Sequence, residues 1–366
     1  MSSRPGAVSG RADACPGVLR LTPAADGALA RVRLVGGFLT AQGISALSAA
    51  AVELGDGRLE LTSRGNLQLR GLDPAVSGEL SERLRRAGLW PSPSHERVRN
   101  IMSSPLAGLD RASDLRGVVD ELDRRLCATP RLAELSGRFL FAVDDGRGDM
   151  TALAADVTIH PGGVNGLAST EPVDTALALA LAFLDERAAQ GSDAWRIAEL
   201  VEGPARVTAR LGLGGPTPPP EPTPPPRPGL VRRHDGGTAL VLAVPLGRLL
   251  AEQSRWLSQV IGAAPARVTP WRGIVLPEAD EVTVAAAAGL GFGVTADSPW
   301  ALVSACAGRP GCAKSLADVQ ADARRDRLRW PGRVVRFSGC ERRCGRPAET
   351  QIDVVATATG YEIREN

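Results

Sequence analysis

Residues 30–72 read ARVRLVGGFLTAQGISALSAAAVELGDGRLELTSRGNLQLRGL, and the spacing of the apolar residues changes twice along this segment. It begins with the alternation of a half-buried strand, passes through a glycine turn, and continues with the spacing of an amphipathic helix. Alternation returns in the last part, which predicts a second strand. The pattern as a whole predicts a β-α-β unit.

A second segment, residues 239–279, reads ALVLAVPLGRLLAEQSRWLSQVIGAAPARVTPWRGIVLPEA and repeats this order of elements at nearly the same lengths. Each segment ends in a predicted strand with a threonine and an arginine, Thr62 and Arg64 in the first and Thr269 and Arg272 in the second. Such repetition predicts two halves about a pseudo-twofold axis, with Arg64 and Arg272 near a shared cleft. Chance similarity between two ordinary β-α-β units is the alternative.

The clearest boundary is the proline-rich stretch GGPTPPPEPTPPPRPG. Proline fixes φ and removes a backbone donor, so we predict an extended spacer, with a ligand for an adaptor domain as the alternative. The predicted parts are a disordered N-terminus (1–14), a first half (15–75), a mixed α/β domain (90–213), the linker (214–229), a second half (230–285) and a C-terminal segment (286–366).

The composition is that of an ordinary globular protein, with 43% hydrophobic residues, 23% charged residues and a formal net charge of +2. This charge gives no reason to expect nucleic acid as a partner. The longest apolar run, ALALALAFL at 176–184, is shorter than the ~20 residues that a membrane span needs, and the N-terminus does not resemble a secretion signal. We therefore expect a cytoplasmic protein, in which clustered cysteines are reduced and available as metal ligands.

Four of the six cysteines lie in two short segments, ACAGRPGCAKS at 305–315 and FSGCERRCGRP at 337–347. Their spacing is C-x5-C followed by C-x3-C. A five-residue gap is more open than a zinc knuckle, and the flanking glycines and arginines suit a bulky anionic cluster. We predict a [4Fe–4S] cluster, with structural zinc as the alternative. The predicted ligands are Cys306, Cys312, Cys340 and Cys344.

The cysteine spacing, the two β-α-β halves and the Thr-x-Arg strand together resemble the sulfite/nitrite reductase superfamily. The resemblance implies an α+β fold in which two ferredoxin-like half domains, related by a pseudo-twofold axis, embrace α/β [4Fe–4S]-binding domains. In that family siroheme lies in the cleft with arginines on its carboxylates, a pairing that suits the planar guanidinium. Carried over to this chain, Cys344 would bridge the cluster and the siroheme iron.

Two departures bear on the activity. Gly65 stands where the reductases usually have glutamine, and the segment Gly137–Leu140 stands where sulfite reductases have Arg-Lys-Phe-Lys. Leu140 supplies no cation for a small oxyanion, which disfavours sulfite reduction. The sequence instead resembles the oxygenase branch of the superfamily, which implies a monooxygenase of aerobic cobalamin synthesis that uses O2 to hydroxylate precorrin-3A and form a γ-lactone.

The resemblance also implies the cofactors and partners. The [4Fe–4S] cluster would pass electrons from an external donor, an NADH-dependent reductase or a ferredoxin, and a mononuclear non-haem iron would activate O2, with His160 as a candidate ligand. Siroheme is expected only if the chain is a siroheme-dependent nitrite or sulfite reductase. A non-catalytic tetrapyrrole-binding protein with structural zinc is the third hypothesis.

Arg64 and Arg70 are six positions apart, so on one strand their side chains would share a face with Asn66 and Gln68. Such a polar row suits either a ligand-binding surface or a solvent-exposed one. The sequence assigns no role to Cys15, Cys127 or Lys314. The residues predicted to bind tetrapyrrole carboxylates are Arg64, Asn66, Arg70, Arg99, Asn100, Arg138, Arg272 and Arg309.

Overall fold

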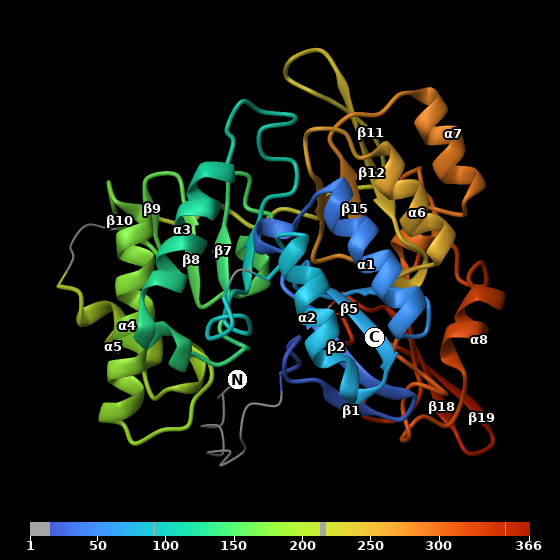
Figure 1. The fold of residues 1–366 in the computed structure, drawn as a ribbon, viewed down its shortest axis with the longest axis horizontal. Helices are drawn as coiled ribbons and strands as arrows, with labels where there is room; N and C mark the ends of the chain where they lie inside the picture. The colour runs from blue at the N-terminus through green and yellow to red at the C-terminus, as the bar shows by residue number, and fades with distance from the viewer. Residues whose placement is uncertain (1–14, 91, 213–216, 348) are drawn as a thin grey trace. The chain divides into compact units, whose positions relative to one another are not determined.

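A computed structural model describes residues 15–90, 92–212, 217–347 and 349–366. The expected disordered segment 1–14 and residues 214–216 of the expected linker lie outside this part of the chain. The chain divides into two compact units, and we describe each by itself (Figure 1). The half-domain unit comprises Val18–Val32, Leu39–Leu89 and Pro226–Asn366. The α/β unit comprises Arg33–Phe38 and Trp90–Pro225 with the described residues before Val18.

The half-domain unit contains two parts with the same order of elements (Figure 1). The first part consists of β1 (Thr22–Ala24), β2 (Gly27–Val32), α1 (Ala41–Leu54), β4 (Leu59–Leu61), β5 (Leu67–Leu72) and α2 (Ser77–Arg86). The second part consists of β11 (Gly229–Arg232), β12 (Thr238–Ala243), α6 (Ala251–Val260), β14 (Ala266–Val268), β15 (Gly273–Leu276) and α7 (Glu281–Gly289). Helices α1 and α6 pack against each other.

Two short strands are exchanged between the sheets of these parts. β13 (Arg248–Leu249) pairs antiparallel with β4 and completes the sheet β1-β2-β5-β4-β13. β3 (Phe38–Leu39) occupies the same edge of the other sheet, β11-β12-β15-β14-β3. This reciprocal exchange is the arrangement expected of two repeats related by a pseudo-twofold axis. The predicted α+β fold with two half domains is confirmed.

The final helix of each half domain does not fit the predicted domain boundary: α2 lies entirely beyond the boundary, and α7 crosses it. The first was predicted to end at residue 75, before α2, and the second at 285, inside α7. Leu80 and Leu84 are the buried hydrophobic residues of α2, and the helix packs on α1. Such a narrow apolar stripe gives little periodic signal in the sequence.

The same tight turn joins the last two strands of both half domains. In the first, the Thr62 N–H donates to the Asn66 carbonyl (2.9 Å), and the Thr62 hydroxyl accepts from the Asn66 N–H (3.2 Å). In the second, Thr269 and Gly273 form the same two hydrogen bonds, at 2.9 and 3.0 Å. The two turns therefore align Thr62 with Thr269 and Asn66 with Gly273.

This alignment corrects the predicted pairing of Arg64 with Arg272. Gly65 at φ 63° occupies the left-handed position that Arg272 occupies at φ 59°, so Arg64 aligns with Trp271. A non-glycine residue in this conformation costs about 1–2 kcal/mol. The prediction was wrong by one position because it aligned the two arginines by residue type. The hydrogen bonds of the turn instead align the two residues with left-handed backbone conformation, Gly65 and Arg272.

The C-terminal part of the half-domain unit is a four-stranded sheet in the order β16-β17-β18-β19. The first three strands are parallel, β19 is antiparallel, and α8 packs on β16 and β17. Phe337, on β17, lies in a core with Val303 and Val354. The elements are β16 (Val303–Ala305), α8 (Val319–Arg325), β17 (Val335–Ser338), β18 (Ile352–Thr357) and β19 (Gly360–Glu365).

The α/β unit contains a sheet in the order β10-β9-β8-β7-β6, in which β6, β7 and β8 are parallel. The predicted buried helix at 171–190 is α4, and Leu179 and Phe183 are among its fully buried residues. The elements are β6 (Ile101–Ser103), α3 (Arg116–Ala128), β7 (Phe141–Val143), β8 (Val157–His160), β9 (Gly163–Val164), β10 (Leu167–Ala168), α4 (Pro172–Ala189) and α5 (Gly203–Ala209). Short 3-10 helices also occur in the described chain: η1 (Val35–Gly37), η2 (Pro74–Val76), η3 (Pro130–Glu134), η4 (Thr151–Leu153), η5 (Ile197–Glu199), η6 (Pro245–Gly247) and η7 (Pro299–Ala301).

The parallel parts of these two sheets share a local hydrogen-bond pattern that the sequence did not predict. Ser104 follows β6; its N–H donates to the last carbonyl of β7 (3.0 Å), and its hydroxyl accepts from the Asp145 N–H (3.3 Å). Cys306 follows β16; its N–H donates to a β17 carbonyl (3.0 Å), and its sulfur accepts from the Gly339 N–H (3.2 Å). The α/β unit thus repeats the arrangement around Cys306. Ser104 takes the place of Cys306, and Asp145 takes the place of Gly339.

The described part of the proline-rich linker packs against the α/β unit. The Thr217 N–H donates to the Gly166 carbonyl (2.8 Å), and the Thr223 N–H donates to the Gly148 carbonyl (3.2 Å). Neither helix nor strand forms between residues 217 and 228. Residues 217–225 are grouped with the α/β unit, with which they form these contacts.

No helix in the described ranges combines the length and apolar character needed to cross a membrane.

Candidate functional site

The two cysteine segments lie next to each other at one end of the C-terminal sheet. Cys306 follows β16 and Cys340 lies two residues after β17, so both segments leave the carboxyl ends of adjacent parallel strands, where open α/β sheets bind ligands. The Leu316 N–H donates to the Gly339 carbonyl (2.8 Å), and a Cβ added at Gly339 would lie 1.9 Å from Ser315 Oγ. The two segments are therefore in direct contact, and glycine at 339 permits it.

Arg70, predicted to bind a tetrapyrrole carboxylate, instead supports the first cysteine segment. It is buried on β5, forms a bidentate ion pair with Asp26, and donates through Nη2 to the Gly311 carbonyl at 2.7 Å. A Cβ at Gly311 would lie 3.1 Å from that guanidinium. These contacts leave Arg70 engaged within the half-domain unit, next to the segment that carries Cys312.

A pocket of about 270 Å³ lies beside the cysteine segments. Arg248 on its wall forms an ion pair with Glu60 (2.7 Å) and donates to the Ala307 carbonyl (3.4 Å). Two of the predicted cluster ligands also line it. The lining residues are Glu60, Leu61, Leu246, Gly247, Arg248, Arg272, Ala305, Cys306, Ala307, Gln320, Arg336, Cys344 and Gly345.

Two cations in this pocket are short of acceptors within the described chain. Arg336 is 1% exposed; its Nη2 donates to the Cys344 carbonyl (2.5 Å), but its Nε and Nη1 are buried without a partner. Desolvation, and then repulsion from Arg272, lowers the pKa of Arg336 to about 10. Desolvation also lowers the pKa of the half-buried Arg272, which takes part in none of the ion pairs among described residues. Buried guanidinium groups without acceptors favour an anionic ligand.

The cysteines suit an iron–sulfur cluster in kind and in neighbourhood. All four are free, they lie on two segments in contact, and Cys306 and Cys344 line one pocket with Arg336, which would balance anionic sulfur. Within the described ranges, however, no three or more histidine, cysteine, aspartate or glutamate side chains are grouped to hold a single metal ion. The joint ligation of a cluster by these cysteines is therefore a proposal.

Arg64 and Asn66 lie in the turn between β4 and β5, not on a strand with Arg70 as predicted. The Thr62 hydroxyl accepts from the N–H groups of both residues, which closes the turn around Gly65. The reading of one continuous strand was wrong because it overlooked this glycine. Arg64 is half-buried and Asn66 is buried.

Three other predicted residues lie in the α/β unit. Arg99 forms a bidentate ion pair with Asp123 (2.7 Å), and Asn100 donates to the Gly137 carbonyl (2.7 Å). Arg138 is exposed and stacks over Trp195, with 4.8 Å between its guanidinium carbon and the ring centroid. In the half-domain unit, the exposed Arg309 closes its own loop by donating to the Ser315 carbonyl (2.8 Å).

Leu140, which occupies the position of a sulfite reductase lysine, is 3% exposed. Its N–H donates to Asp156 Oδ2 at 2.9 Å. The residue is therefore part of the core of the α/β unit, where it contributes no charge to a ligand. This burial agrees with the argument that the chain lacks the second cation of a sulfite site.

Asp149 lies in the loop after β7 that matches the second cysteine segment. Its Oδ1 accepts from the Ser104 hydroxyl (2.5 Å), while its buried Oδ2 has no hydrogen-bond partner among described residues and lies 3.8 Å from Arg147 Nε. Burial, with Asp144 and Asp145 nearby, raises the pKa of Asp149 to about 7 despite Arg147. The side chain is therefore mostly protonated below pH 7, well above the pH at which an ordinary aspartate loses its proton.

We predict that Asp149→Asn removes a pH dependence of stability. The folded-state pKa lies above the ordinary value of 3.8, so the folded protein binds a proton that the unfolded chain releases, and stability falls as pH rises from about 4 to about 7. The variant should gain on the order of 2–4 kcal/mol relative to wild type between these limits. Urea unfolding across this range measures the difference, and Asp120→Asn, at an exposed aspartate that pairs with Arg116 on α3, should keep the wild-type slope.

Comparison with known proteins first defines the class. Residues 17–87 match the nitrite/sulfite reductase ferredoxin-like half domain, so the first half domain of this chain is of that class. The Mycobacterium tuberculosis NirA protein has the same fold, with a TM-score of 0.72 and 20% identity over 92% of this chain and 73% of that one.

The particular resemblance is to precorrin-3B synthase. The chain is 28% identical to the precorrin-3B synthase of Sinorhizobium sp, over 97% of its own length and 83% of that protein. It is also 37% identical to the ferredoxin–nitrite reductase of Synechococcus elongatus, over 32% of this chain and 25% of that enzyme. The resemblance inferred from the cysteine spacing and the repeated units is confirmed.

The sequence reasoning missed Arg336 and Arg248. Arg336 lies one residue before the second cysteine segment, and Arg248, on the exchanged strand β13, lies inside the quoted segment 239–279. Arg336 was detectable as the single charged residue in the otherwise uncharged strand β17, because such strands seldom bury an arginine without function. Arg248 carried no comparable signal.

Proposed function

We propose that this protein is a precorrin-3B synthase-like monooxygenase that acts on precorrin-3A. The observation that carries the proposal is the pocket beside Cys306 and Cys344, in which the buried Arg336 has two nitrogens without acceptors among described residues and Arg272 lies close by. Similarity to a precorrin-3B synthase over 97% of the chain supports the choice of substrate. The substrate carries several carboxylates, which such guanidinium groups bind.

The pocket accommodates only part of a tetrapyrrole. Its volume of about 270 Å³ is below the roughly 300–1,000 Å³ typical of sites for drug-sized ligands. In the proposal, Arg272 and Arg336 orient one acidic edge of the substrate, and the Arg248–Glu60 pair keeps that wall in place. Cys306, Cys312, Cys340 and Cys344 would hold a [4Fe–4S] cluster, which supplies single-electron transfer from an external donor. The reaction consumes O2 and two electrons, and one oxygen atom enters the product while the other leaves as water.

A siroheme-dependent nitrite reductase is the second candidate, because two ferredoxin–nitrite reductases match about a third of the chain at 33–37% identity. The absorption spectrum distinguishes the two. Siroheme gives intense macrocycle bands in protein purified without substrate, whereas a cluster alone gives a broad absorption. Strong macrocycle bands would favour the reductase.

The direct test is a single-turnover reaction. The protein is incubated anaerobically with precorrin-3A and at least two electron equivalents of a reduced donor, and is then exposed to isotopically labelled O2. We expect the product mass to increase by one labelled oxygen atom, because the hydroxyl oxygen derives from O2. Product without the label, or unchanged substrate in a sample that contains iron and sulfide, would contradict the monooxygenase assignment.

A further inference from the structure

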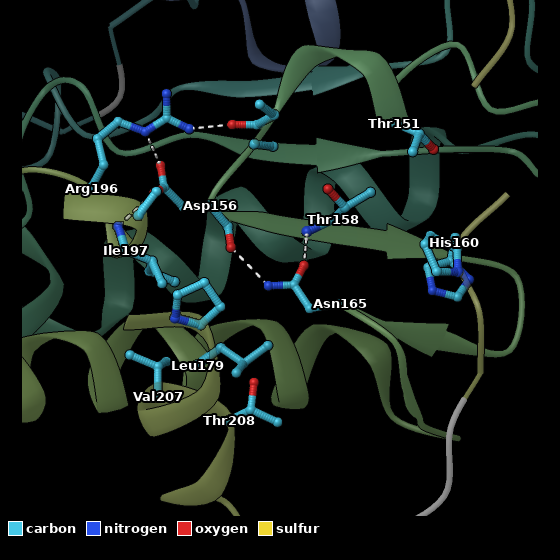
Figure 2. Close-up of a pocket in the computed structure, with 15 residues that line it drawn as sticks. Thr151, Asp156, Thr158, His160, Asn165, Leu179, Arg196, Ile197, Val207 and Thr208 are labelled. Carbon is cyan, nitrogen blue, oxygen red and sulfur yellow. Dashed lines mark hydrogen bonds and ion pairs between the residues drawn. The ribbon is translucent and has the colours of Figure 1, made fainter. Parts of the chain in front are cut away.

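A second cavity lies inside the α/β unit, and none of the residues used above for the proposed reaction lines it (Figure 2). Its volume is about 380 Å³, within the usual range of small-molecule sites. Strand β8 and helices α4 and α5 supply much of the wall, and Pro219 of the proline-rich segment also lines it. The lining residues are Thr151, Ala154, Ala155, Asp156, Thr158, His160, Asn165, Leu179, Arg196, Ile197, Ala198, Pro204, Val207, Thr208 and Pro219.

The charged groups of this cavity neutralise each other. Asp156 accepts from the Arg196 guanidinium (2.7 Å) and from the N–H groups of Ile197 (2.8 Å) and Leu140 (2.9 Å), and Figure 2 shows the Asp156–Arg196 contact. The remaining wall is largely apolar. A charged ligand would find no free counter-charge here, whereas a neutral, mainly apolar molecule would replace water at low cost.

His160 supplies a polar contact that the protein itself leaves unused. The side chain is 3% exposed, and its Nδ1 lies 3.2 Å from the Pro161 carbonyl oxygen. A carbonyl oxygen can only accept, so this contact assigns the hydrogen to Nδ1 and leaves Nε2 as an acceptor. Nε2 is buried without a partner in the described chain, and so is the Thr151 hydroxyl oxygen.

We infer that this cavity binds a small, neutral, mostly apolar molecule carrying a hydroxyl group, which donates to His160 Nε2. A metal ion could also use this nitrogen, but Asp156, the carboxylate of the cavity wall, is fully engaged. Within the described ranges, no group of three or more histidine, cysteine, aspartate or glutamate side chains lies in this cavity to hold a metal ion. In this proposal His160, which the sequence offered as a candidate iron ligand, is a specificity residue of the cavity.

The test compares three probes of nearly equal shape on the full-length protein. 2-Naphthol can donate a hydrogen bond, whereas 2-methoxynaphthalene and 2-methylnaphthalene cannot. We expect 2-naphthol to bind about tenfold more tightly or better, measured by fluorescence titration, because only it satisfies Nε2. Equal affinities for the three probes, or no binding because the cavity holds only water, would overturn the inference.

Two variants locate the binding. His160→Phe removes the acceptor and should bring 2-naphthol to within about twofold of 2-methoxynaphthalene. Leu179→Trp fills the cavity and should abolish binding of all three probes, whereas Leu181→Trp, on the same helix but outside the cavity, should retain it. Probe binding that survives in Leu179→Trp would place the site elsewhere and overturn the inference. If a variant does not fold, the relative affinities of the three probes for the wild-type protein provide the test.

Discussion

Replacing Arg336 by methionine should make the cofactor-free protein more stable while it weakens binding of a carboxylated tetrapyrrole. The wild-type guanidinium is buried with two nitrogens lacking partners, so methionine removes a desolvated charge at the expense of one hydrogen bond to the Cys344 carbonyl. We expect a gain of ~1–3 kcal/mol in the free energy of unfolding without ligand. Affinity for precorrin-3A should fall about 10- to 100-fold, because a charge-assisted hydrogen bond is lost.

Arg248→Met is the matched control, because this arginine lines the same pocket but is paired with Glu60. Replacing Arg248 leaves the Glu60 carboxylate without this ion-pair partner and should destabilise the cofactor-free protein. The two variants should therefore shift the urea midpoint in opposite directions. Destabilisation by Arg336→Met with unchanged affinity for the tetrapyrrole would mean that Arg336 serves the fold and not an anionic ligand.

Replacing Cys340 by serine should abolish the iron–sulfur chromophore. A serine oxygen is a poor substitute for a thiolate in a four-cysteine cluster, and Cys340 lies next to Gly339, where the two cysteine segments touch. We expect iron and acid-labile sulfide to fall from near four of each per chain to a small residue. Chemical analysis and the visible spectrum of anaerobically purified protein measure both.

Cys127→Ser provides the control for this experiment. Cys127 is a free, half-buried cysteine on α3 in the other unit, and burial raises the pKa of its thiol. The variant should keep its iron and sulfide. Zinc without labile sulfide in the wild-type protein, or a full chromophore in Cys340→Ser, would remove the cluster proposal.

The repeated β-α-β units were predictable because they depend on local periodicity. Residues 30–72 and 239–279 carry enough apolar alternation to predict both half domains, and the helix at 171–190 was recognisable by its long apolar run. Helix α2 was not included in its half domain, because its apolar stripe is narrow. The exchange of β3 and β13 could not be predicted from the sequence, since two-residue strands leave no periodic signal.

The arginine assignments show a different limit. Sequence reasoning treated every arginine in a family motif as a possible carboxylate ligand, yet Arg70 is held by Asp26 and Gly311, and Arg99 by Asp123. Arg336, which was not among the predicted ligands, has two buried nitrogens without a hydrogen-bond partner among described residues. Residue type and spacing carry no information about which charges are already neutralised.

By itself, the sequence determined the class of fold, the duplication and the two cysteine segments, because these depend on short-range spacing along the chain. Only the tertiary structure decided which cations face a pocket without acceptors, and which cysteines line it. The physical reason is that a buried charge is paired or unpaired according to groups that the fold brings in from far away. The Arg70 contact with Gly311, for example, joins residues 241 positions apart.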